Sequence, residues 1–157
     1  MQFQPRPLPF AGSLPGLSEQ LLTSHHQNNY GGAVKRLNAI RAELSQRPPG
    51  SLPAFILNGL KREELIAVNS MLLHELHFAS LGGDGQRMQP AMDLALAASF
   101  GSAATWSEEF VAMGKALGGG SGWVLLCFQP QNGSLVNQWA SDHSQAMAGA
   151  VPILALD

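Results

Sequence analysis

The chain has 157 residues, a length that allows one compact domain or two small lobes. Because 45% of the residues are apolar and only 13% are charged, the composition excludes an intrinsically disordered protein. The net charge of −2 shows no overall excess of basic residues of the kind that binds nucleic acids. No apolar run reaches transmembrane length. The single cysteine, Cys127, lies in an apolar run, and the N-terminus does not look like a signal peptide. We therefore expect a cytoplasmic protein with no nucleic-acid or membrane partner.

The first half of the chain is predicted to form a long helical hairpin. Residues 1–16 are rich in proline and glycine and are typical of an extended arm. Ser18 is a typical N-cap, and helical spacing of apolar residues predicts one helix from Ser18 to about Gln46. Gly31-Gly32 suggests a bend or a close approach of another backbone in this helix, which Pro48-Pro49-Gly50 ends.

A second long helix is predicted from about Leu60 to Ser80, with Leu65, Val68, Leu72 and Glu75 or Leu76 at helical steps. Residues 82–89 are the best candidate for a linker, so we expect an N-terminal part over residues 1–84 and a C-terminal lobe over 85–157.

The C-terminal lobe is predicted to combine helices with a small sheet. Two helices are expected over about Pro90–Phe100 and Ser102–Leu117, although Thr105 to Glu108 resembles a capping box that offers a later start for the second. Strands are expected over Trp123–Gln129, Leu135–Ala140 and Val151–Leu156, and Asn132-Gly133 predicts a hairpin turn between the first two. The fold class is therefore α+β, a helical hairpin followed by a lobe with a three-stranded antiparallel sheet. The last strand is apolar and is predicted to be buried.

Histidines and a terminal carboxylate are the candidates for chemistry. His25 and His26 fall on the first predicted helix, His74 and His77 on the second, and Asp157 follows the last strand. Imidazole is a common metal ligand, but a histidine on an apolar helix face is more often a hydrogen-bonded core residue. Asp157 is likewise either solvated at a strand end or a ligand.

Four segments in order resemble the iron/manganese superoxide dismutase family. They are LPFAGSLPGLSEQLLTSHHQNNYGGAVKRLN, NSMLLHELHF, ALAASFGSAATWSEEFVAMGKALGGGSGWVLL and VPILALD, which together cover about Leu8 to Asp157. The resemblance implies a homo-oligomeric enzyme, a dimer or larger, in which one Fe or Mn ion cycles between two oxidation states and converts superoxide to dioxygen and hydrogen peroxide.

The resemblance also implies the metal ligands. His25 matches the first ligand when its segment is aligned without gaps to Leu37-Asn38, whereas a slip of one residue would select His26. His74 matches the second ligand and Asp157 the third. In the family a fourth ligand, a histidine, comes four residues after the aspartate. That segment and the closing helices are absent from the sequence, so Asp157 is expected to be a ligand whose histidine partner has been cut away.

Other positions depart from the family pattern. A glutamine that donates a hydrogen bond near the metal in one subtype is replaced by Ser70, and the resemblance implies that His143 takes this role from the sheet side. The usual gateway tyrosine and histidine align with Ala33 and Asn29, so Tyr30, one turn before Ala33, is the candidate for proton delivery.

Two other functions are compatible with these residues. Two histidines and one carboxylate also describe the iron site of non-haem oxygenases, although those enzymes are normally β-barrels. The second alternative is an inactive or metal-poor relative that acts as a folding or interaction module.

Overall fold

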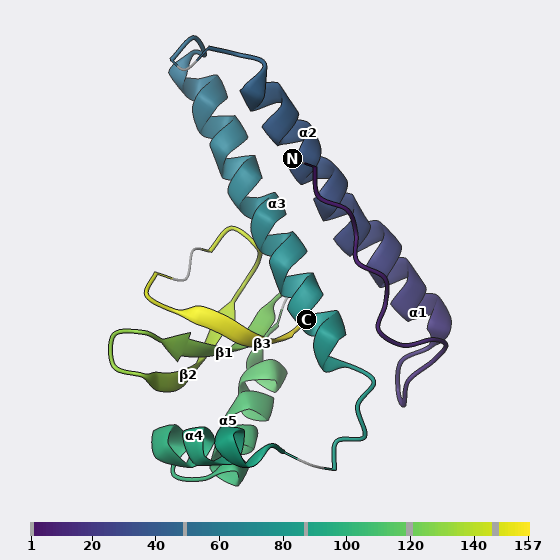
Figure 1. Ribbon diagram of the computed structural model, residues 1–157, viewed down its shortest axis with the longest axis vertical. Helices are drawn as coiled ribbons and strands as arrows, with labels where there is room; N and C mark the ends of the chain where they lie inside the picture. The colour runs from purple at the N-terminus through teal and green to yellow at the C-terminus, as the bar shows by residue number, and fades with distance from the viewer. Residues whose placement is uncertain (1, 49, 87, 119–120, 146–147) are drawn as a thin grey trace. The chain divides into compact units, whose positions relative to one another are not determined.

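The computed structural model describes residues 2–48, 50–86, 88–118, 121–145 and 148–157 (Figure 1). The chain divides into two compact units, Met1–Ala79 and Ser80–Asp157. The first is helical and the second combines helices with a three-stranded antiparallel sheet, so the predicted α+β class is confirmed.

The first helical stretch of the N-terminal unit has three parts, α1 (Glu19–Ser24), the π-helical turn η1 (His25–Tyr30) and α2 (Gly31–Ser45). Ser18 caps α1 as predicted, because its Oγ accepts a hydrogen bond from the amide of Leu21 at 3.1 Å. The predicted single helix is interrupted directly before Gly31-Gly32, where a bend or a close backbone approach was expected, and the interruption is a π-helical turn. There the turn before Gly31 widens, and the residues that form it, His-His-Gln-Asn-Asn-Tyr, are only moderate helix formers. Pro49, expected to help end this helix, lies outside the described residues.

The second long helix, α3 (Ala54–Ser80), begins earlier than the predicted Leu60. Pro53 supports the first turn, since its carbonyl accepts hydrogen bonds from the amides of Ile56 and Leu57, both at 3.0 Å. The buried face also differs from the predicted Leu65, Val68 and Leu72 stripe, because Leu72 is 47% exposed. The buried residues follow another helical stripe, namely Ala67, Met71, His74 and Phe78.

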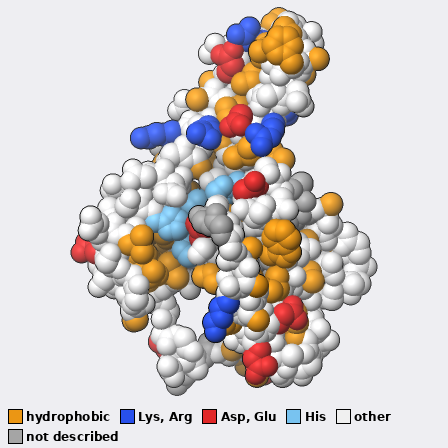
Figure 2. Space-filling model, turned by 180° about the vertical axis from the view of Figure 1, so that it is seen from behind, with side chains coloured by type: hydrophobic (Ala, Val, Ile, Leu, Met, Phe, Trp, Pro, Cys, Tyr) orange, Lys and Arg blue, Asp and Glu red, His pale blue; other side chains and the backbone are white. Residues whose placement is uncertain are grey.

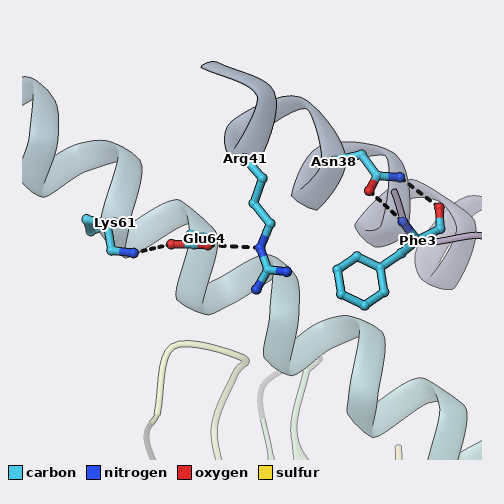
Figure 3. A network of polar contacts seen from close by, with 5 residues as sticks. All are labelled: Phe3, Asn38, Arg41, Lys61 and Glu64. Carbon is cyan, nitrogen blue, oxygen red and sulfur yellow. Dashed lines mark hydrogen bonds and ion pairs between the residues drawn. The ribbon is translucent and has the colours of Figure 1, made fainter. Parts of the chain in front are cut away.

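Polar contacts join the arm, α2 and α3 into the predicted hairpin (Figure 1). Figure 3 shows Arg41 of α2 and Lys61 of α3 both paired with Glu64, while the amide and carbonyl of Phe3 in the arm bond the side chain of Asn38 at 2.9 Å. Figure 2 shows basic and acidic side chains mixed along the hairpin, and hydrophobic ones gathered at the end where α2 and α3 are connected.

The C-terminal unit begins with α4 (Pro90–Phe100) and α5 (Ala103–Ala116), close to their predicted bounds. Gly101 separates the two helices with φ of 86°, a conformation that favours glycine. Ser102 then caps α5 by accepting a hydrogen bond from the amide of Thr105 at 3.0 Å, so the alternative start at Thr105 is wrong.

The sheet contains β1 (Trp123–Gln129), β2 (Ser134–Ala140) and β3 (Val151–Leu156), in the order β2-β1-β3 and with both pairings antiparallel. The predicted hairpin turn joins β1 to β2, with Gly133 at φ of 72°. The expectation that β3 is buried is wrong, because Val151 is 50% exposed. This strand lies at the sheet edge, where Pro152, which has no amide proton, is tolerated beside a shift in the strand register.

The core of the C-terminal unit lies between its helices and the sheet. Leu96 of α4 and Phe110 of α5 pack with side chains of the first two strands, namely Val124, Leu126 and Leu135. Arg87 of the predicted linker and Gly119-Gly120 of the family-like segment lie outside the described residues. None of the helices that the structure describes has the length and apolar character needed to cross a membrane.

Candidate metal centre

His74 is held on α3 in a defined tautomer. The side chain is only 1% exposed, and its Nδ1 lies 2.6 Å from the backbone carbonyl oxygen of Ser70, one turn earlier. Because a carbonyl oxygen can only accept, Nδ1 carries the proton and donates it. In the neutral ring Nε2 then carries the lone pair, which is the arrangement that a metal-binding histidine requires.

His25 is brought to His74 within the helical unit. The ring centroids lie 5.0 Å apart with the planes at 85°, and a ring nitrogen of each residue lies within 4.8 Å of the other. His77 and Phe78 complete the surroundings of His25, at centroid distances of 5.5 and 5.2 Å. Two imidazoles from two different helical segments thus lie next to each other.

His26, the alternative first ligand, is engaged elsewhere. Its Nε2 lies 2.8 Å from the carbonyl oxygen of Arg6 in the N-terminal arm and must donate a proton to it. Its ring contacts Tyr30 and Phe78, at 5.2 and 5.3 Å between centroids. The local geometry therefore favours His25 over His26 as the partner of His74.

Tyr30, which is buried, forms a polar cluster with Arg6 and Glu75. Its hydroxyl donates to Glu75 Oε1 at 3.0 Å, and the same oxygen accepts from the amide of Arg6 at 2.8 Å. Burial and the bond to Glu75 raise the pKa of Tyr30, against the opposing effect of the Arg6 amide. Tyr30 therefore keeps its proton at physiological pH.

Arg6 and Glu75 were not anticipated from the sequence. Glu75 offered one signal, an acidic residue in an otherwise apolar helical stretch directly after His74. Arg6 offered none, because an isolated basic residue in a proline-rich arm is ordinarily solvated.

The two remaining candidates, His143 and Asp157, belong to the C-terminal unit. Asp157 follows β3 and is exposed, and His143 lies in the loop after β2 with its ring 5.5 Å from that of Trp123. Burial lowers the pKa of His143, while the carboxylates of Asp157 and Asp142 act in the opposite direction. His143 is therefore neutral at physiological pH and close enough to Asp157 to feel its charge.

The donor set fits a hard or borderline metal ion. The helical unit offers two imidazole nitrogens, donors that suit iron and manganese among other metals. The only thiol does not compete, because burial of Cys127 in β1 raises its pKa to about 11 and keeps it protonated.

Comparisons with known proteins give a consistent result. A family profile described as the C-terminal domain of iron/manganese superoxide dismutases matches residues 88–157. The iron superoxide dismutase of Cupriavidus metallidurans is 62% identical over 144 residues, which cover 92% of this chain and 73% of that protein. A manganese superoxide dismutase of Haloferax volcanii is 32% identical over 162 residues, covering 100% of this chain and 79% of the relative. An iron superoxide dismutase of Pyrobaculum aerophilum is 28% identical over 158 residues, covering 96% and 74% respectively.

Proposed function

We propose that this chain, which belongs to the iron/manganese superoxide dismutase family, converts superoxide to dioxygen and hydrogen peroxide. The observation that carries the proposal is the high identity to an iron superoxide dismutase over most of the chain. The meeting of His25 and His74 supports it. Membership of this family does not favour the oxygenase or the inactive module as alternatives.

The proposed ligands of a single iron or manganese ion are His25, His74 and Asp157. When bound, the ion supplies the one-electron redox chemistry of the reaction. His74 is prepared for binding by its hydrogen bond to the Ser70 carbonyl, which presents Nε2 as the ligand atom. Asp157 contributes a negative charge that offsets part of the charge of the ion. Relatives with iron and with manganese are both found, so the proposal is for either metal.

His143 and Tyr30 are proposed to handle protons, because the formation of hydrogen peroxide from superoxide consumes two. The neutral imidazole of His143 can donate a hydrogen bond close to Asp157. The hydroxyl of Tyr30 keeps its proton and is already oriented by Glu75 and Arg6, so it can serve as a fixed step in a proton path.

The finer parts of the proposal concern assembly and location. We propose a homodimer or larger homo-oligomer, supported by exposed apolar side chains at the start of α3, among which Phe55 is 74% exposed. Light scattering at several protein concentrations tests the oligomeric state.

We propose a cytoplasmic location because the one cysteine is buried and the chain makes no disulfide of its own, which suits a reducing compartment. Cell fractionation tests this.

The test of the activity combines metal analysis with a dismutation assay on the full chain. We expect about one iron or manganese ion per chain, and loss of both metal and activity in His74→Ala and Asp157→Asn. Asp93→Asn, which removes a carboxylate from the first turn of α4, is the matched control and should change neither. A wild-type chain that binds no metal and has no activity would favour the module, and dioxygen-dependent oxidation of an organic compound would favour the oxygenase.

A further inference from the structure

We propose that the N-terminal arm is a positioning element for the metal site, in which Arg6 and Glu75 hold the π-helical turn that carries His25. The proposal deepens the function above and rests on the proposed metal site. It concerns Arg6 and Glu75, which are not themselves proposed ligands.

The π-helical turn η1 is the unusual feature that needs support. A π turn contains one residue more than an α-helical turn and is a rare geometry, found mostly as single turns inside α-helices and frequently at functional sites. Here it lies between two regular α-helices and is built from moderate helix formers. Its local sequence gives no preference for the wider turn, so contacts from outside the helix must select it.

Those contacts converge on one residue of the arm. The carbonyl of Arg6 accepts from His26 Nε2 at 2.8 Å, and the amide of Arg6 donates to the Tyr30 hydroxyl at 2.8 Å. His26 and Tyr30 are the second and last residues of η1, so the arm is bonded at both ends of the turn.

Glu75 ties this arrangement to α3. One carboxylate oxygen accepts from the Tyr30 hydroxyl at 3.0 Å, and the other lies 3.3 Å from Arg6 Nη2. The side chain of Glu75 is 13% exposed, so its two contacts are largely shielded from water, whereas that of Arg6 is 76% exposed. The arm, η1 and α3 are thus joined through a single carboxylate directly next to His74.

The consequence falls on His25, which precedes His26 in the turn. If η1 relaxed to an α-helical turn, its first residue, His25, and the residues before it would rotate by about 100° relative to those after the turn, the angle of one residue in an α-helix. Such a rotation would take the His25 ring away from its place 5.0 Å from His74. Holding His26 and Tyr30 therefore holds His25 in position.

The same hairpin supplies a matched control. Glu64 on α3 pairs with Arg41 at 3.0 Å, and its side chain is 14% exposed, almost as Glu75 is (Figure 3). It lies three helical turns away from Glu75, at about 16 Å along the axis. Loss of this pair removes an equivalent ion pair without touching η1.

The test compares Arg6→Pro, Glu75→Gln and Glu64→Gln in the full chain. Arg6→Pro removes both the amide proton and the guanidinium, and Pro5 and Pro7 already flank that position. Hydrogen exchange of the amides in residues 25–31 is measured on metal-free protein, and Mn²⁺ affinity is measured by competition with a chelator. In Arg6→Pro and Glu75→Gln we expect faster exchange than in the wild type. We also expect about tenfold weaker Mn²⁺ binding, the lower end of the loss in metal affinity seen when residues that orient ligands are changed. Glu64→Gln should match the wild type in both measurements.

Three results would overturn the proposal. One is unchanged exchange in Arg6→Pro and Glu75→Gln. Another is an equal effect in Glu64→Gln, which would reveal general loosening of the hairpin. The third is an effect in Glu75→Gln alone, which would indicate the charge beside His74 rather than the position of η1. A wild-type chain that fails to bind Mn²⁺ would refute the metal site instead, and the exchange comparison would still decide whether the arm holds the turn.

Discussion

At His74, one backbone hydrogen bond determines which ring nitrogen is available to a metal. The acceptor is the carbonyl of Ser70, so the identity of the side chain at position 70 matters little for this role. A helix offers that carbonyl to any histidine one turn later, provided that the ring is oriented toward it.

Ser70→Ala is therefore expected to keep metal binding. The Nδ1 bond to the backbone oxygen remains, while the more distant contact of Ser70 Oγ with Nδ1, at 3.3 Å, is lost. We expect Mn²⁺ affinity within about threefold of the wild type, well below the loss seen when an orienting partner is removed. A loss of tenfold or more would mean that the hydroxyl, and not the carbonyl, orients His74.

Glu64 gives a pH-dependent prediction. Its hydrogen bond to Lys61, followed by that to Arg41, lowers its pKa below the ordinary value of 4.5 against the effect of burial. Because the pKa of the folded state is below that of the unfolded state, this stabilisation is present above pH 4.5 and is lost as the pH falls through the folded-state value. Thermal unfolding should show Glu64→Gln less stable than wild type at neutral pH, with the difference vanishing in acid. A difference that grew in acid would contradict the assignment.

Resemblance to the family was sufficient to select His25 and His74, but not the residues that hold them. The family-like segments carry the proposed ligands in order, so their positions could be proposed from the sequence. Arg6 acts through its backbone amide and carbonyl, whose partners depend on where the arm runs in space. No sequence pattern encodes that path.

Among the elements, regular helices and strands were predicted best. Both C-terminal helices and β1 have strong caps or long apolar runs, and their bounds agree closely with the structure. The two misjudged elements have weak local signals. Asn58-Gly59 is a typical turn pair, although the structure places it inside α3, which begins earlier than predicted. The π turn η1 depends on contacts from the arm. The edge position of β3 follows from the strand order, which the composition of the strand does not encode.

The cap of α5 is a prediction at this scale. Ser102 Oγ accepts from the Thr105 amide at 3.0 Å, so Ser102→Ala leaves a helix-end donor without this partner. We expect a loss of about 1 kcal/mol in unfolding free energy, measured by urea denaturation. Ser107→Ala, in the body of the same helix, should change stability by less than about 0.5 kcal/mol. Equal losses of unfolding free energy in the two variants would show that the cap does not stabilise the helix more than an ordinary position in the helix does.

For the whole molecule, the proposed centre draws on both units. In the proposal, the helical unit would contribute His25 and His74, and the C-terminal unit would contribute Asp157. Each unit has stabilising contacts of its own. The first has the polar contacts among Arg6, Tyr30 and Glu75, and the second has the core between its helices and the sheet. A shared ion would make metal binding depend on both units folding, so the metal should raise the melting temperature of the chain as a whole.

The most direct test of the central claim is electron spin-echo spectroscopy of the Mn²⁺-loaded chain with ¹⁵N-labelled histidine. The proposed ligand set predicts at least two histidine nitrogens coupled to the ion, one fewer in each of His25→Ala and His74→Ala, and no change in number in His26→Ala. It also predicts that Asp157→Asn weakens Mn²⁺ binding while the coupled nitrogens remain. A count of coupled nitrogens that is the same in His25→Ala and His74→Ala as in the wild type would contradict the account.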